Sequence, residues 1–97
     1  MAGFTHNLIM DVDAAQETLS VIRTHREAMD VALAEIFNEV ENGIRQSWQG
    51  PSAYEFFILY DRVYDRLEGN ILALKDLQTK FQEEIIDWLE MSGTLAP

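Results

Sequence analysis

Apolar residues recur every seven positions along both halves of the chain, which predicts two long amphipathic helices. In the first half, the series and its companion three residues later comprise Val12, Leu19, Leu33 and Val40, with Ala15, Ile22, Met29 and Ile36. In the second half they comprise Ala53, Tyr60, Leu67, Leu74, Phe81 and Trp88, with Phe57, Tyr64, Ile71 and Ile85. Such spacing gathers apolar side chains on one stripe of each helix, where a neighbouring helix covers them.

The segment between the halves predicts a tight reversal. In Ser47-Trp48-Gln49-Gly50-Pro51, a glycine that tolerates positive φ precedes a proline that suits the first turn of a helix. We expect a single domain over residues 1–97, with a first helix at about 12–46, the turn at 47–51 and a second helix at about 52–90. The ends are expected to be short and flexible.

The ends of the two predicted helices carry recognisable signals. Asp13, with Gln16 three residues later, resembles a capping box, and Asp11 is an equally good cap for the first helix. Ser92-Gly93 supplies a stop for the second helix.

Two polar residues interrupt the apolar series, Arg26 in the first half and Gln78 in the second. A cation among apolar neighbours must find a carboxylate or reach water, and polar residues in such a seam often fix helix register. We interpret Arg26 and Gln78 as candidate register residues, with simple exposure at the edge of the stripe as the alternative.

Both helices carry more apolar surface than one hairpin covers. The residues outside the main series are Ala14, Val21, Ala28 and Ala32 in the first helix, and Phe56, Leu59, Val63, Ala73 and Leu77 in the second. A second stripe on both helices is what a four-helix bundle requires. The sequence therefore predicts an all-α fold, an antiparallel two-helix hairpin that dimerises into a four-helix bundle. The residues expected in the bundle core or dimer interface are Leu19, Ile22, Met29, Leu33, Ile36, Val40, Phe56, Phe57, Tyr60, Val63, Tyr64, Leu67, Ile71, Leu74, Phe81, Ile85 and Trp88.

The composition narrows the range of partners and activities expected for this chain. The net charge of −10, from 17 acidic and 7 basic residues, disfavours nucleic acid and anionic membrane surfaces as partners. No cysteine, Glu-x-x-His spacing or nucleophile–base arrangement is present, so we expect no enzyme activity, no cofactor and no metal site. Asp61, Asp65 and Glu68, with Arg62 and Arg66, are interpreted as a solvated face with local ion pairs. No signal peptide and no apolar run of roughly 18–20 residues is visible.

Trp48-Gln49-Gly50, a W-x-G between two long helices near the middle of about 100 residues, resembles the WXG100 (ESAT-6-like) family. These proteins are small substrates of type VII secretion systems. The resemblance covers nearly the whole chain in architecture and implies a hairpin that pairs as a homodimer, or as a heterodimer with a second WXG100-like protein. It also implies export without a signal peptide by a secretion ATPase, with Trp48, Gln49 and Gly50 forming half of the export signal.

The family's other half-signal is a Y-x-x-x-[D/E] motif beyond the second helix. Residues 81–97 contain no tyrosine, and the match at Tyr64 and Glu68 falls on a core position of the heptad, so we interpret it as coincidental. Either the partner supplies the tail signal, or the protein is a cytoplasmic helical-hairpin adaptor that binds another protein and is not secreted. Membrane disruption, proposed within the family, fits poorly with the strong negative charge.

Overall fold

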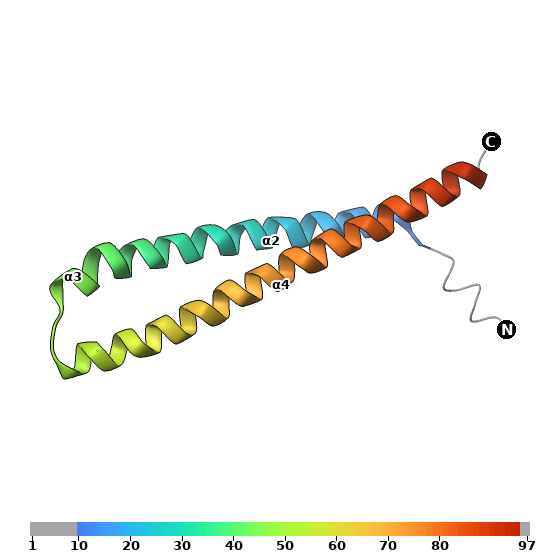
Figure 1. Ribbon diagram of the computed structural model, residues 1–97. Helices are drawn as coiled ribbons and strands as arrows, with labels where there is room; N and C mark the ends of the chain where they lie inside the picture. The colour runs from blue at the N-terminus through green and yellow to red at the C-terminus, as the bar shows by residue number, and fades with distance from the viewer. Residues whose placement is uncertain (1–9, 96–97) are drawn as a thin grey trace.

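The chain forms an antiparallel helical hairpin, described by a computed structural model over residues 10–95, with side chains as far as residue 91 (Figure 1). In order, the elements are α2 (Val12–Glu39), the π-helical segment η1 (Val40–Ile44), α3 (Arg45–Ser47) and α4 (Pro51–Leu95). No strand occurs in this range, and the hairpin is a rod of 69 × 26 × 16 Å. The flexible ends expected at residues 1–9 and 96–97 lie outside the described part.

The first helix begins where the sequence offered two caps. Asp11 is the N-cap, and its carboxylate accepts a hydrogen bond from the backbone N–H of Ala14 at 3.1 Å. Asp13 lies inside the first turn, where its charge faces the positive end of the helix dipole. At the other end of the chain, α4 continues to Leu95, past the stop expected at Ser92-Gly93, because a glycine permits a helix end but does not impose one.

A π-helical turn near the end of the first helix changes which side chains face α4. In a regular α-helix, Arg45 lies about 120° around the axis from Leu33, outside the stripe that packs on α4. The extra residue of the π turn at Val40–Ile44 rotates the following residues back by about one position. Arg45 therefore reaches the carboxylate of Asp61 on α4.

A cluster of buried side chains joins the two helices at the end opposite the turn. There Ala15 and Leu19 of α2 form a buried cluster with Ile85 of α4, against which Met10 and Phe81 pack. The other buried side chains are Leu33, Ala53 and Ile71. Many large apolar side chains on both helices stay exposed, so the hairpin by itself covers little of its apolar surface.

Candidate interaction surfaces

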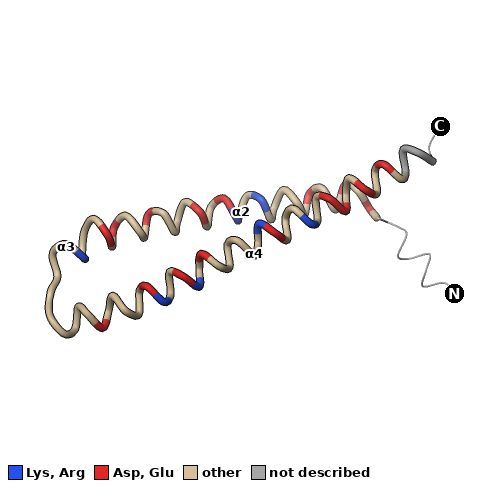
Figure 2. Tube along the Cα trace, in the orientation of Figure 1, with Lys and Arg blue, Asp and Glu red and all other residues tan. Residues whose placement is uncertain are grey.

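The reversal is closed by an aromatic cluster. The Trp48 ring lies 5.5 Å from that of Phe56 and 5.9 Å from that of Phe57, and these two phenylalanine rings are 5.3 Å apart. Trp48 nevertheless remains 36% exposed, so its indole packs inside the turn and also keeps part of the ring accessible at the surface. No charged residue lies between Arg45 and Glu55, which leaves this end of the rod uncharged (Figure 2).

Gly50 is required by the geometry of the turn. Its φ of 117° is disfavoured for any residue with a side chain. Its carbonyl accepts the backbone N–H of Tyr54 at 3.0 Å, which starts α4 directly after the turn.

Gly50→Ala is therefore expected to lower the free energy of unfolding by about 1–2 kcal/mol through backbone strain alone, since a Cβ there meets nothing within 4 Å. The matched control is Gly69→Ala in the middle of α4, where a Cβ also meets open space and no positive φ occurs. That change should raise the free energy of unfolding by up to about 1 kcal/mol. Urea unfolding followed by circular dichroism measures the free energy of unfolding of both variants. Equal effects of the two substitutions would contradict the claim that the turn requires a glycine at position 50.

Arg45 ties the turn end of the hairpin together. Its guanidinium bonds Glu41 at 2.8 Å and Asp61 at 2.7 Å, and lies 4.5 Å from the centre of the Phe57 ring. The local ion pairs expected for Asp61 with Arg62 or Arg66 do not form: within residues 10–91, Asp61 pairs with Arg45 across the hairpin. Sequence reasoning missed this bridge because the π turn sets the direction of Arg45, although the Glu41–Arg45 spacing was a visible signal.

Two tyrosines of α4 continue this cluster into the seam. The hydroxyl of Tyr60 is buried and has no hydrogen-bond partner among the described residues. This burial, with the Glu41 carboxylate as the second cause, raises the pKa of Tyr60. Tyr64 is half-buried, with its ring 5.5 Å from that of Phe37 on α2. Tyr64, the tyrosine of the Y-x-x-x-E match, thus packs between the helices rather than standing free.

The structure brings together the two polar residues that interrupt the apolar series. Arg26 Nε donates to Gln78 Oε1 at 2.9 Å, and its Nη1 pairs with Asp30 at 2.8 Å. Lys75 approaches the same carboxylate at 3.7 Å. The Arg26 side chain is only 15% exposed, so this polar layer crosses the seam and favours a single alignment of α2 on α4.

Gln78→Leu is expected to lower the free energy of unfolding by about 1–2 kcal/mol, because the largely buried guanidinium of Arg26 loses one of its acceptors. Adding Arg26→Leu should recover most of that loss, since an apolar pair replaces the broken polar one. A double-mutant cycle in urea measures the coupling. Strictly additive effects would mean that the Arg26–Gln78 hydrogen bond does not couple the helices.

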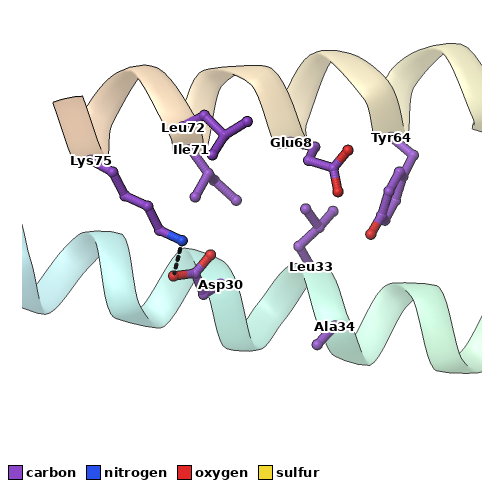
Figure 3. Close-up of a pocket in the computed structure, with 8 residues that line it drawn as sticks. All are labelled: Asp30, Leu33, Ala34, Tyr64, Glu68, Ile71, Leu72 and Lys75. Atoms are coloured by element: carbon purple, nitrogen blue, oxygen red, sulfur yellow. Dashed lines mark ion pairs between the residues drawn. The ribbon is translucent and has the colours of Figure 1, made fainter.

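The gap between the helices opens on one side into a polar hollow of about 250 Å³ (Figure 3). Leu33 and Ile71 lie at its floor, and the Asp30–Lys75 pair closes one end. Tyr64 and Glu68 lie at its other end, and Leu72 is at the rim. Two carboxylates, Asp30 and Glu68, and the ammonium group of Lys75 therefore line this hollow.

The other side of the gap is apolar. A hollow of about 280 Å³ is lined by Met29, Ala32, Leu33, Ile36, Leu67, Asn70 and Ile71. Residues three or four apart share a helix face, so this side extends along both helices. Its members are Val21, His25, Ala28, Met29, Ala32 and Ile36 of α2, with Phe56, Leu59, Val63, Leu67, Asn70 and Leu77 of α4. We call this set the uncharged face, because none of these members is Asp, Glu, Lys or Arg. Charged residues flank it, since Glu35 and Glu39 line a neighbouring hollow with Ala32 and Ile36.

The residues expected in the core or interface fall into three groups by exposure. Four are buried, namely Leu19, Leu33, Ile71 and Ile85. Eight are half-buried, namely Ile22, Val40, Phe57, Tyr60, Tyr64, Leu74, Phe81 and Trp88. Five remain 40–48% exposed, namely Met29, Ile36, Phe56, Val63 and Leu67, and all five belong to the uncharged face. The hairpin alone therefore leaves this part of the expected interface open.

No protein-family model, curated protein or solved structure matches this chain. Among the described residues, no helix is both long and apolar enough to cross a membrane, and no three His, Asp or Glu side chains are grouped to hold a metal ion.

Proposed function

We propose that this chain is a small WXG100-like protein that works through protein–protein contacts, as a dimer, in a type VII-like secretion system. Its role there is that of a substrate or effector, or of a chaperone for its partner. The observation that carries the proposal is the position of Trp48-Gln49-Gly50, at the reversal of a hairpin whose uncharged face lies open. An open apolar face of this length is typical of half a four-helix bundle.

In this proposal the protein is exported without a signal peptide, and the secretion ATPase recognises the turn. Trp48 is suited to that contact because it is held by Phe56 and Phe57 yet remains partly exposed. The second half of the export signal comes from a partner, since Tyr64 of this chain packs against Phe37.

A cytoplasmic adaptor is the second candidate. The observation that favours it is the same burial of Tyr64, which leaves no free tyrosine signal on the described part of this chain. In that case the uncharged face binds a partner's amphipathic helices, and the turn has only a structural role.

Trp48→Ala separates the two functions. Under the secretion proposal, we expect the amount of protein in the culture medium of the native host to fall at least about tenfold, as when the motor ATPase is deleted. The matched control is Tyr54→Ala, which truncates an aromatic residue near the same end that is 69% exposed and has no ring contact with any other described residue. Equal amounts of the protein in the medium with and without the motor ATPase would contradict the secretion proposal. The cytoplasmic adaptor would then be the remaining candidate function.

A further inference from the structure

The first arm of the hairpin, made of α2, η1 and α3, ends in a segment that is held by few contacts. Neither η1 nor α3 has a buried side chain. Part of what holds them is local, since Gln46 Nε2 donates to the backbone carbonyl of Glu41 at 3.1 Å. Among the described residues, their one ion pair with α4 is that of Arg45 with Asp61, and the same guanidinium lies over the ring of Phe57.

The π turn of η1 holds one residue more than an α-helical turn needs. If the same residues took up a regular α-helix, the chain after them would advance by about 1.5 Å and rotate by about 100° around the helix axis. There is room for this change, because a Cβ added at Gly43 would meet nothing within 4 Å. Gly50, already at positive φ in the reversal, tolerates the backbone adjustment that keeps the hairpin closed.

This rotation changes the contacts of two residues near the turn. It carries Arg45 away from Asp61 and Phe57 but keeps it within reach of Glu41, because residues four apart are neighbours on an α-helix. It also moves Trp48, which directly follows α3, relative to the two phenylalanine rings that it contacts. The loss of the cross-hairpin ion pair is a small one, since the Asp61 side chain is 60% exposed and exposed pairs stabilise little.

The present arrangement also leaves a buried group unsatisfied. The hydroxyl of Tyr60 has no hydrogen-bond partner among the described residues, and the guanidinium of Arg45 lies 5.8 Å from the centre of its ring. A buried hydroxyl without a partner destabilises the arrangement that buries it. Rotation of Arg45 away from this ring opens a path for water to the hydroxyl, which brings the second arrangement closer in free energy to the first.

We propose that the π turn at Val40–Ile44 is a conformational switch, which exchanges between its present form and a regular α-helix and thereby turns Arg45 off Asp61 and reorients Trp48. Shifts of helix register of this kind occur in microseconds to milliseconds. The inference concerns the hairpin itself and goes beyond the proposed function. Any partner that binds the turn meets Trp48 in one of two orientations and favours the one that it binds better.

Deletion of Gly43 removes the extra residue without removing a side chain. In a regular α-helix that lacks this residue, Arg45 lies about 20° around the axis from Leu33, instead of about 120° in the full-length chain. The deletion variant therefore keeps Arg45 directed at Asp61 and has no second arrangement to adopt. Its helix content by circular dichroism should match that of the natural chain.

Relaxation dispersion of the indole ¹⁵N resonances measures the exchange, because the chain has only two tryptophans. For the natural chain we expect exchange at Trp48, with a second state populated at about 0.1–10%, and a flat profile at Trp88 near the other end of the rod. In the Gly43 deletion variant, the exchange contribution at Trp48 should fall at least about fivefold. The profile should not change with protein concentration, which separates this exchange from association.

Asp61→Asn shifts the equilibrium in the opposite direction. Losing the cross-hairpin ion pair should raise the population of the second state about twofold or more. Asp65→Asn is the matched control, since Asp65 forms no ion pair with another described residue, and it should leave the population unchanged.

Four results would each overturn the switch: no exchange at Trp48 in the natural chain, equal exchange at Trp88, exchange that survives the deletion of Gly43, or no difference between Asp61→Asn and Asp65→Asn. If the deletion variant does not fold, the comparison of the two aspartate variants decides the question. None of these results bears on the proposed function, which rests on the position of Trp48 at the turn and on the uncharged face.

Discussion

Leu67→Asp is expected to abolish the proposed dimer. The substitution places a carboxylate at the rim of the apolar hollow, in the centre of the uncharged face. On association each of the two carboxylates would lose water without gaining a cation, which typically costs several kcal/mol. We therefore expect the dissociation constant to rise at least about 100-fold, as measured by sedimentation equilibrium.

Leu72→Asp is the matched control for this experiment. Leu72 lies on the same helix and is 55% exposed against 40% for Leu67, but it lines the polar hollow on the opposite side. Its replacement should leave both dimerisation and helix content nearly unchanged. If Leu72→Asp dissociated the dimer and Leu67→Asp did not, the polar side of the hairpin would be the interface.

Ile85→Ala is expected to produce the largest loss of folding stability. Ile85 is 3% exposed and packs on Ala15 and Leu19, in the cluster that joins the two helices at the end away from the turn. Truncating a buried isoleucine to alanine typically lowers the free energy of unfolding by about 2–4 kcal/mol. For a chain of this size, thermal unfolding at a fixed protein concentration should shift down by about 10–20 °C.

The neighbouring Ile86 provides the control, since it is the same residue type one position along and is 45% exposed. Ile86→Ala should change the free energy of unfolding by less than about 0.5 kcal/mol. Similar losses for both isoleucines would mean that the cluster around Ile85 does not hold the helices together.

The hairpin was predictable because every local signal agrees with it. The heptad series in both halves, Pro51 at the start of α4 and Gly50 at the turn all favour the same two helices. Asp11 was distinguishable from Asp13 as the N-cap only in the structure, because both are followed by residues that continue a helix equally well.

The contacts across the hairpin were less predictable. Arg26 and Gln78 stood out in the sequence as polar interruptions, but their hydrogen bond depends on the register that the turn sets. The Arg45–Asp61 pair needs the rotation made by the π turn at Val40–Ile44, and nothing in that segment marks such a turn in advance.

The uncharged face was predictable in part. The second stripe on α4 was visible from Phe56, Leu59 and Val63, but Asn70 was overlooked, although it continues the spacing of Phe56 and Val63 by seven. Only the apolar hollow shows that Asn70 shares one side of the hairpin with Met29 and Ile36 of the other helix.

The mass of the purified natural chain in solution tests the central claim, that this chain works as a dimer whose interface is the uncharged face. Size-exclusion chromatography with light scattering, at tens of micromolar protein, gives this mass directly. We predict a single helical species of about twice the chain's 11.2 kDa. A fully helical monomer at that concentration would contradict the claim, because the uncharged face would then be stable while exposed to water.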